Sequence, residues 1–322
     1  MHDETGAGPW PRITVLTPCL NGARHIGEAA DSVQRQRYPD LEHIVLDAGS
    51  TDGTLEILGR YPALKVVSEP DEGAHDAMNK GIREATGEII GFLNVDDLYP
   101  DGLLAEVGQA FAADPGLDVV TGGAVVFEDG GAGGRRAVVA RDLGRAGGLW
   151  LPELAFGAVG FNSRFFRRRV FGRIGDFNNE YFITADRHFL IRAALAGLKA
   201  RHLGRASIFF RMHADSRTIN PQRQYAPEMA REYIRMAREF AQATRGNRAH
   251  HRVFMAWHAF ESAKLALRSL GAGRPREALR VLGGLALRDP LWPLGLLRAS
   301  ALRGAVRRGE RYGADEPGEA KR

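Results

Sequence analysis

Residues 12–47 read RITVLTPCLNGARHIGEAADSVQRQRYPDLEHIVLD and contain a strand–helix–strand pattern. Aliphatic and β-branched residues fill 13–16 and 43–46, and apolar residues recur at helical spacing over 26–36. The same alternation continues downstream, with helices expected at 54–61 and 75–85 and strands at 65–67 and 89–93. Alternation of this kind is typical of βαβ units around a parallel sheet, so the sequence predicts an α/β fold.

The rest of the chain continues the alternation and then becomes helical throughout. The expected elements are a helix at 102–113, a strand at 118–127, a hairpin tip or loose loop at 128–134, a glycine-rich surface stretch to 148, helices at 164–171 and 185–196, a strand at 207–210, and helices near 226–243, 249–270, 275–287 and 292–308. We expect a tail at 1–11, a first domain at 12–215, a helical region at 216–310 and a disordered tail at 311–322, with the domain boundary between Asp215 and Pro221.

Composition narrows the class of protein. The 322 residues are 44% hydrophobic and 26% charged, which is ordinary for a globular protein. Cys19 is the single cysteine, which excludes a disulfide framework and a zinc site built from several cysteines and favours a reducing compartment. No run of about 18 apolar residues occurs, and the N-terminal residues lack the basic-then-apolar order of a signal peptide, so we expect a cytoplasmic protein.

Charge is unevenly distributed along the chain. Residues 1–200 carry 20 Lys and Arg against 28 Asp and Glu, whereas residues 201–322 carry 24 against 11. The two halves are therefore expected to meet different partners. The basic half contains no zinc finger, no RNA-binding aromatic motif and no tight basic stripe, so we do not expect a nucleic-acid partner.

Two adjacent carboxylates end the apolar strand at 89–93, in the sequence Asn94-Val95-Asp96-Asp97. Neighbouring carboxylates repel one another, and a bound divalent cation commonly offsets that repulsion. Mg²⁺ or Mn²⁺ would complete its shell with water and diphosphate oxygens. The alternative is a pair of residues that caps the next helix, and these residues alone leave both interpretations open.

Two other expected strands also end in small and polar residues, at 17–22 and 47–53. Carboxyl ends of parallel strands meet at the edge where open α/β sheets bind ligands, so the three segments indicate one site. Asp47 could accept hydrogen bonds from a base or a ribose hydroxyl, whereas Asp52 suits the cap of the following helix.

The order of these motifs resembles family 2 inverting glycosyltransferases of the GT-A fold, similar to bacterial cell-surface polysaccharide glycosyltransferases. The resemblance covers about residues 12–215 and rests on five blocks in order. They are Thr17-Pro18…Asn21-Gly22, Asp47-x-Gly49-Ser50-x-Asp52-Gly53, Glu69-Pro70-Asp71-x-Gly73 with Asp76-Ala77-Met78-Asn79-Lys80-Gly81, Ala85-x-Gly87-Glu88, and Asn94-x-Asp96-Asp97. It implies a nucleotide-binding, Rossmann-like mixed sheet flanked by helices, followed by a C-terminal helical region.

The resemblance also implies a site for a nucleoside diphosphate sugar, with UDP as the expected nucleotide. Thr17 and Asp47 would contact the nucleoside, Asp71 and Lys80 would lie near the base or the phosphates, and Asp96 would contact the ribose or the donor sugar. A lysine at one helix position is otherwise more often a solvated surface residue, so Lys80 has that alternative.

The metal site implied by the resemblance centres on Asp97, the last residue of a DXD-like motif, with Mn²⁺ or Mg²⁺ as the cofactor. His213 would be a further metal contact or touch the diphosphate. The sequence departs from the family at Ala214-Asp215-Ser216, where many relatives carry a Gly-Gly-x-Ser-like run. That departure and the frequency of structural histidines leave the function of His213 open.

Asp186 stands at the start of the helix expected at 185–196, a position that suits an N-cap residue. The resemblance implies that it is the general base, which takes the proton of an acceptor hydroxyl. One carboxylate can serve both purposes. The Gln-x-x-Arg-Trp motif of processive synthases is absent, so we expect one sugar transferred per encounter.

The basic helical region has two interpretations. Apolar residues at helical spacing most often pack in a core, but residues 285–308 also match an amphipathic helix at a membrane surface. Such a contact would bring the enzyme to a saccharide or lipid-linked acceptor at the inner face of the membrane. The arginine run at 164–169 could face an anionic acceptor, although a solvated helix face is the commoner meaning.

Three other functions remain as alternatives. A sugar nucleotidyltransferase would need a glycine-rich basic loop after the first strand, and a Rossmann dehydrogenase would need Gly-x-Gly-x-x-Gly there; residues 17–24 contain neither. A catalytically degenerate sugar-nucleotide-binding or scaffold protein is the non-enzymatic alternative. The joint presence of Asp47, Asp96, Asp97 and Asp186 argues against it.

Overall fold

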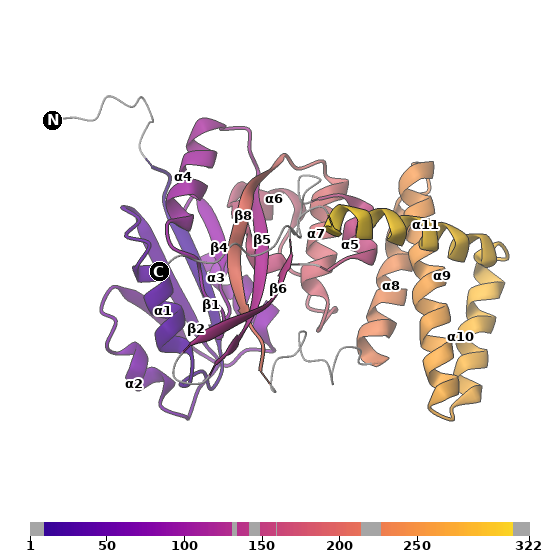
Figure 1. Ribbon diagram of the computed structural model, residues 1–322, viewed down its shortest axis with the longest axis horizontal. Helices are drawn as coiled ribbons and strands as arrows, with labels where there is room; N and C mark the ends of the chain where they lie inside the picture. Colours follow the sequence, from indigo (N-terminus) through magenta and orange to yellow (C-terminus); the bar gives the residue numbers. More distant parts are fainter. Residues whose placement is uncertain (1–9, 131–133, 142–148, 159, 214–226, 312–322) are drawn as a thin grey trace. The chain divides into compact units, whose positions relative to one another are not determined.

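The structure is a computed structural model that describes residues 10–130, 134–141, 149–158, 160–213 and 227–311 (Figure 1). It divides into two compact units, Met1–Leu149 with Gly160–Ser216, and Trp150–Val159 with Arg217–Arg322. The short segment 150–159 groups with the C-terminal helices, which no signal in the sequence indicated. The expected boundary at 215–221 lies outside the described residues, as do parts of the glycine-rich stretch and most of both terminal tails.

The first unit is built on one eight-stranded sheet in the order β3-β2-β1-β4-β7-β5-β6, with β8 paired to β5 off this path. The strands β1 to β4 run parallel, β7 is antiparallel to β4 and to β5, and β6 is antiparallel to β5, which is parallel to β8. The strands are β1 (Ile13–Cys19), β2 (Leu41–Asp47), β3 (Leu64–Ser68), β4 (Ile89–Phe92), β5 (Val119–Asp129), β6 (Arg135–Arg141), β7 (Arg164–Arg167) and β8 (Ala200–Arg211).

Helices flank this sheet, as Figure 1 shows. They are α1 (Ile26–Gln34), α2 (Thr54–Leu58), α3 (Ala74–Glu84), α4 (Leu103–Ala113), α6 (Arg169–Ile174) and α7 (Ala185–Leu195). The mixed sheet with flanking helices confirms the predicted fold class. Each helix and strand expected between residues 12 and 127 is present, with ends shifted by a few residues because terminal turns are set by packing as well as by sequence.

The core of the sheet explains why the first strands are so apolar. Every residue of β1 is buried, because β2 and β4 pair with both of its edges and helices cover the sheet. Beyond β4 a cluster of phenylalanines fills the interior, and the ring of Phe161 lies 5.0 Å, centroid to centroid, from those of Phe92 and Phe177. Phe189 of α7 joins the cluster at 5.7 Å from Phe161. This cluster fixes α7 and the segment before it to the sheet.

The prediction of a helix at 164–171 was wrong. Residues 164–167 form β7 between β4 and β5, and helix α6 begins only at Arg169. Arg164 and Arg167 are buried. The Arg167 guanidinium donates to the carbonyls of Leu117 at 2.8 Å and Phe111 at 2.7 Å, so backbone acceptors satisfy its buried N–H groups. The run is therefore not a solvated helix face over its first four residues.

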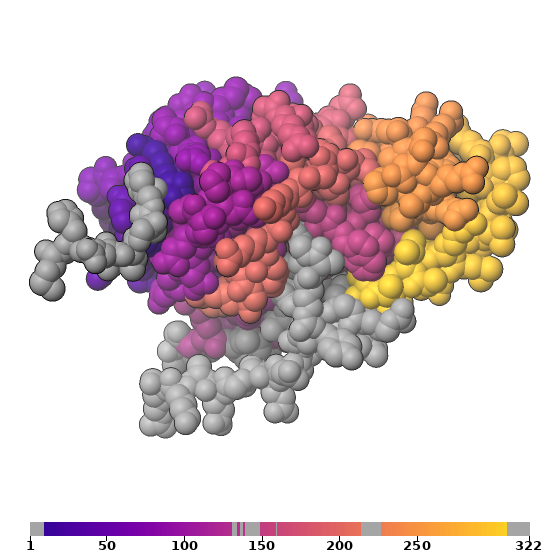
Figure 2. All heavy atoms as spheres, turned by 90° about the horizontal axis from the view of Figure 1, so that it is seen from above, coloured from indigo at the N-terminus to yellow at the C-terminus, as the bar shows by residue number. Residues whose placement is uncertain are grey.

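The second unit is helical, with α5 (Leu151–Phe156), α8 (Pro227–Ala243), α9 (Arg248–Gly271), α10 (Pro275–Arg288) and α11 (Trp292–Arg311). The four helices expected in this region are confirmed. Helix α9 is central, since α5, α8, α10 and α11 all pack on it, with Trp257 buried in the middle. In Figure 2 the atoms of α8 to α11 form one continuous body, coloured orange to yellow. No helix of the described chain has both the length and the apolar composition needed to cross a membrane.

Candidate active site

The loops after β1 and β2 are locked together at the carboxyl edge of the sheet. The backbone N–H of Asn21 donates to Ser50 Oγ at 2.8 Å, the N–H of Thr51 donates to Asn21 Oδ1 at 3.0 Å, and the N–H of Ala23 donates to Asp52 Oδ2 at 2.9 Å. Asn21 has a φ of 53°, a left-handed conformation that Asn tolerates better than most residues. These bonds give the edge a defined shape, which a ligand site requires.

Asp52 is not the N-cap residue of α2, which is Gly53. Its carboxylate instead bonds to the N–H of Ala23 and, at 3.1 Å, to the N–H of Thr54. Asp52 therefore connects the loop after β1 to the start of α2.

Asp47 ends β2 and is buried. Its carboxylate accepts hydrogen bonds from Ser68 Oγ at 2.7 Å and from the N–H groups of Gly49 at 3.1 Å and Ser50 at 3.2 Å. Burial raises its pKa, but the hydrogen bonds from Ser50, Ser68 and Gly49 outweigh burial and hold the pKa below its ordinary value. The structure thus maintains an ionised carboxylate, a hydrogen-bond acceptor, at this strand end.

Asp47, Asp71 and Lys80 line one small pocket, together with Leu46, Val67, Glu69 and Ala77. Lys80 Nζ donates to the carbonyl of Pro70 at 2.6 Å and lies 3.2 Å from Glu69 Oε1. Asp71 accepts from the N–H of Gly73 at 2.8 Å, which shapes the turn into α3. Three of the five residues expected to contact the donor are therefore brought together.

Thr17 is placed differently from the other expected donor contacts. Its side chain is fully buried, and Oγ1 lies 2.9 Å from Nε2 of His43 on β2. Burial lowers the pKa of His43 to about 4, so this ring is neutral at pH 7. The hydroxyl of Thr17 is thus part of the sheet interior, and contact with a nucleoside would have to come from its backbone or its neighbours.

Asp96 and Asp97 follow β4 and have different environments. Asp97 is 3% exposed, and its carboxylate accepts from the N–H of Arg211 at 3.1 Å and from Asn94 Nδ2 at 3.1 Å. Burial, and then the negative charge of Asp96, raise the pKa of Asp97 well above its ordinary value. Asp96 is more exposed, and its Oδ2 lies 3.0 Å from His213 Nε2. The expected metal and donor-sugar residues therefore form a second cluster.

This second cluster lies at the same edge of the sheet as the Asp47–Asp71–Lys80 pocket. The edge runs in the order β3, β2, β1, β4, so the pocket beside β2 and β3 and the turn after β4 are separated by the end of β1. Gly22, after β1, approaches the turn closely, because a Cβ atom there would lie 2.4 Å from Val95 Cγ2. A ligand that reaches from one cluster to the other would pass over residues 20–24.

Arg211 and His25 belong to this cluster and were not expected from the sequence. Arg211 is 2% exposed; its Nε donates to the carbonyl of Asp96 at 3.0 Å, and its guanidinium pairs with Glu28 at 2.7 Å and with Asp129. The guanidinium also lies 4.8 Å above the Phe127 ring. Arg211 therefore holds the Asp96–Asp97 turn through the carbonyl of Asp96 and the carboxylate of Asp97. The signal available in the sequence was its position two residues before His213, in an apolar strand.

His25 precedes α1, and its ring centroid is 5.6 Å from that of His213. Its buried Nε2 has no hydrogen-bond partner among the described residues. Burial, and then the charge of Arg211, lower the pKa of His25, so the ring is neutral at pH 7. The cluster therefore contains a neutral imidazole with one buried nitrogen that is unpaired in the described part of the chain.

The Asp96–Asp97 cluster fits a divalent cation that is shared with a diphosphate. In the described part of the chain no group of three or more His, Cys, Asp or Glu side chains is placed to hold a metal. Mg²⁺ and similar ions need only one or two carboxylates when substrate phosphates and water fill the rest of the shell. Burial and the charge of Asp96 disfavour the ionised form of Asp97 more than its hydrogen bonds favour it, and a cation would offset that difference. His213 lies beside this pair, with its Nε2 3.0 Å from Asp96 Oδ2.

Asp186 lies in the first turn of α7 and is not its N-cap residue, which is Thr184. Asp186 is half-buried, and its Oδ1 accepts from the N–H of Arg187 at 2.6 Å. The prediction that Asp186 caps this helix was wrong, because the N-cap residue is Thr184 and Asp186 lies within the first turn.

The segment that leads into α7 is tied to α3, which contributes Ala77 and Lys80 to the Asp47–Asp71–Lys80 pocket. Asn79 of α3 donates to the carbonyl of Phe177 and accepts from its N–H, both at 2.9 Å. Asn179 Nδ2 donates to Asp76 Oδ1 at 3.2 Å, and a Cβ atom on Gly73 would lie 3.0 Å from the ring of Phe182. Side chains of α3 therefore position the chain just before Asp186.

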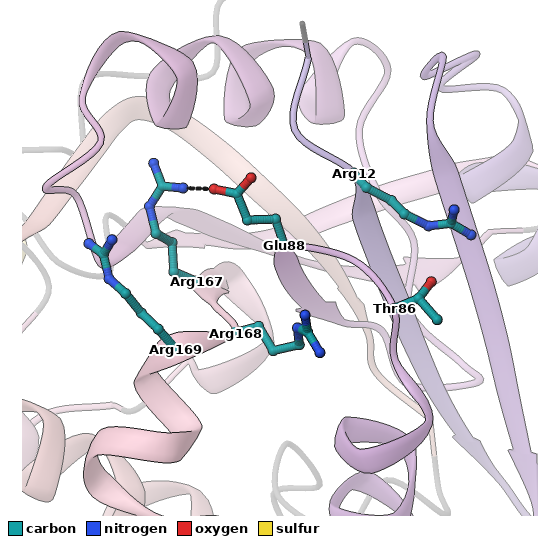
Figure 3. Close-up of a pocket in the computed structure, with 6 residues that line it drawn as sticks. All are labelled: Arg12, Thr86, Glu88, Arg167, Arg168 and Arg169. Carbon is teal, nitrogen blue, oxygen red and sulfur yellow. Dashed lines mark hydrogen bonds and ion pairs between the residues drawn. The ribbon is translucent and has the colours of Figure 1, made fainter.

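A larger pocket of about 460 Å³ lies at the opposite edge of the sheet (Figure 3). Its lining comprises Arg12, Thr86, Glu88, Arg167, Arg168 and Arg169. Arg12 precedes β1 and Glu88 precedes β4, so this pocket is at the amino ends of the parallel strands. The dashed line in Figure 3 joins Arg167 to Glu88, which shows that one of the arginines is already paired. Residues 167–169 therefore do not face the candidate active site.

Comparison with known proteins adds family evidence to this geometry. The model of the family described as "Glycosyl transferase family 2" matches residues 14–175. A "PGL/p-HBAD biosynthesis glycosyltransferase" of Mycobacterium tuberculosis is 34% identical over 192 residues, which cover 56% of this chain and 69% of the relative. An uncharacterized glycosyltransferase of the same organism is 34% identical over 195 residues, covering 58% of this chain and 70% of the relative.

Solved structures show the same fold at low sequence identity. TarS of S. aureus in complex with UDP-GlcNAc aligns with a TM-score of 0.62 at 19% identity, covering 94% of this chain and 92% of the TarS chain. The mannosyltransferase PcManGT of Pyrobaculum calidifontis, in complex with GDP-Man and Mn²⁺, aligns with a TM-score of 0.53 at 21% identity, covering 96% and 92%. These likenesses establish the GT-A fold expected from the sequence.

Proposed function

The chain belongs to glycosyl transferase family 2 and is a glycosyltransferase, and from this we propose a metal-dependent, inverting transfer of one sugar from a nucleoside diphosphate sugar to an acceptor hydroxyl. We propose UDP as the donor nucleotide. The observation that carries the proposal is that the Asp47–Asp71–Lys80 pocket and the Asp96–Asp97 pair share the carboxyl edge of one sheet. Complexes of TarS with UDP-GlcNAc and of PcManGT with GDP-Man and Mn²⁺ support donors of this class.

The donor would bind along this edge. In the proposal, Asp47 and the segment of Thr17 contact the nucleoside, and Asp71 and Lys80 lie near the base or the phosphates. Asp96 contacts the ribose or the donor sugar. Asp47 suits this purpose because its hydrogen bonds keep it ionised, so that it can accept from a base N–H or a ribose hydroxyl.

A divalent cation, Mn²⁺ or Mg²⁺, held by Asp97 beside Asp96 and in reach of His213, would supply positive charge against the leaving diphosphate. The residues of this chain then have two tasks. Arg211 and Asn94 hold the carboxylate of Asp97 in place through their N–H groups. Asp186 takes the proton of the acceptor hydroxyl as its oxygen attacks the anomeric carbon from the face opposite the diphosphate, which inverts the configuration.

We propose a saccharide or a lipid-linked sugar as the acceptor, in cell-surface polysaccharide or glycolipid synthesis. The name of the mycobacterial relative, which refers to PGL/p-HBAD biosynthesis, supports an acceptor of this kind. The proposal also includes a cytoplasmic location and peripheral contact of the basic C-terminal helices with the inner face of the membrane. The excess of Arg over acidic residues after residue 200 supports that contact.

Asp97→Asn is expected to weaken binding of UDP in the presence of Mn²⁺ by about tenfold or more, because the carboxylate is the proposed metal ligand. Asn has nearly the same volume as Asp, so the turn should keep its shape. Calorimetric titration of UDP with Mn²⁺, and again with a chelator, measures the effect. We expect the variant to lose the difference between the two titrations.

Asp101→Asn is the matched control, since this carboxylate lies four residues further along and its side chain is 84% exposed. It should bind UDP as the unchanged protein does. If Asp97→Asn also binds UDP normally with Mn²⁺, the assignment of Asp97 to the metal is wrong.

A further inference from the structure

The junction of α10 and α11 exposes four leucines within eleven residues. Leu287 is 87% exposed, Leu291 66%, Leu294 46% and Leu297 69%. We call these four side chains the leucine corner. Apolar residues are often exposed singly on soluble proteins, but a group of this kind marks an interaction surface.

The local sequence holds these leucines outward. Helix α10 ends at Arg288, and the turn that follows is fixed by Asp289, whose Oδ1 accepts from the N–H of Leu291 at 3.1 Å. Helix α11 then packs on α9 through its small residues, since a Cβ atom on Gly295 would lie 3.0 Å from Ala259 Cβ. Buried Leu285 and Ala299 face the interior of the unit. The corner is therefore a defined part of the fold whose large side chains point away from it.

The charges around the corner are almost all positive. Arg288 and Arg298 are exposed beside the leucines. The stretch 278–307 also contains Arg280, Arg303 and Arg307, while Asp289 is its single acidic residue. The carboxylate of Asp289 is already used in the turn. Exposed leucines flanked by arginines match the two requirements of a membrane interface, which are apolar side chains for the acyl boundary and cations for anionic headgroups.

We propose that the leucine corner, with Arg288 and Arg298, docks on the surface of a bilayer that contains anionic lipids. The inference rests on the proposed function, because docking brings a transferase to lipid-linked acceptors in the bilayer. Half-buried Trp292, between the leucines, also suits the headgroup level, where Trp is enriched. The corner adds a peripheral contact that is made by side chains alone, at the turn between α10 and α11.

The test uses the full chain and sedimentation with vesicles of phosphatidylcholine alone or of phosphatidylcholine mixed equally with phosphatidylglycerol. The unchanged protein should sediment with the mixed vesicles and remain in solution with phosphatidylcholine alone. Leu291→Gln with Leu297→Gln should weaken binding to the mixed vesicles by roughly tenfold or more, because binding scales with the apolar area inserted. Arg288→Gln with Arg298→Gln should weaken it by about tenfold at low salt, since each cation contributes near an anionic surface.

The matched control is Leu267→Gln with Leu279→Gln, which replaces leucines 70% and 71% exposed near the opposite end of α10. This variant should bind the mixed vesicles as the unchanged protein does. All replaced leucines are exposed, so thermal unfolding should be unaltered in both double variants.

Three results would overturn the inference. They are failure of the unchanged protein to bind the mixed vesicles, equal loss in the control variant, and concentration-dependent self-association that the Leu291–Leu297 variant abolishes while vesicle binding persists. Titration of UDP in the absence of vesicles is measured separately on the same variants. Normal UDP binding without vesicle binding would reject the corner alone, and vesicle binding without UDP binding would reject the proposed function alone.

Discussion

Asp186→Asn is expected to reduce sugar transfer by about 10²- to 10⁴-fold while UDP still binds with unchanged affinity. The amide has nearly the size of the carboxylate but cannot accept a proton from the attacking hydroxyl. Because water can replace the acceptor, the release of UDP from a UDP-hexose in buffer with Mn²⁺ gives the rate. Calorimetric titration of UDP gives the affinity.

Glu180→Gln is the matched control for this variant, because Glu180 is an exposed carboxylate in the segment that leads into α7. It should release UDP at nearly the unchanged rate. Two results contradict the assignment of Asp186 as the base. One is an Asp186→Asn rate above about a tenth of the unchanged rate, and the other is a loss of UDP binding equal to the loss of rate.

Arg211→Met is expected to lower the free energy of unfolding by about 2 to 4 kcal/mol, because the variant loses every hydrogen bond and ion pair of a buried guanidinium. The change removes the bond to the Asp96 carbonyl and leaves Glu28 and Asp129 without this cation. Both carboxylates are nearly half exposed, so water compensates part of the loss. Urea unfolding measures the difference, with the slope of the transition unchanged.

Arg135→Met is the matched control that separates the effect of losing a buried cation from the effect of losing any cation beside Glu28. Arg135 pairs with Glu28 at 2.6 Å as Arg211 does, but its side chain is 49% exposed. We expect a loss of about 1 kcal/mol or less for this variant. Equal losses in the two variants would show that Arg211 does not support the Asp96–Asp97 turn in the way described.

The order of elements in the first unit could be predicted because it depends on short-range patterns. Runs such as 13–16 and 43–46 are apolar enough to identify parallel strands buried on both faces, and the spacing of apolar residues fixed the helices between them. The pairing of β7 could not be predicted this way. It includes the buried Arg167, whose guanidinium is satisfied by backbone carbonyls that distant segments contribute.

The candidate site shows the same division. Asp47, Asp71 and Lys80 were predicted from motif order, and the structure brings them to one pocket because β2, β3 and α3 are neighbours. Arg211 and His25 were missed, since their relevance comes from β8 pairing with β5 and from the loop after β1. Neither contact follows from local sequence. The exposed leucines at 287–297 could not be told from core leucines until the packing of α10 and α11 on α9 was known.

Calorimetric titration of UDP, GDP and dTDP into the full chain, with Mn²⁺ and with a chelator, tests the central claim most directly. A nucleoside diphosphate bound between the Asp47 pocket and the Asp97 carboxylate should need the metal. The account predicts that UDP binds with Mn²⁺, that its affinity falls by about tenfold or more with the chelator, and that GDP and dTDP bind more weakly. Binding of none of the three nucleotides under either condition would contradict the account and favour a degenerate scaffold on the same fold.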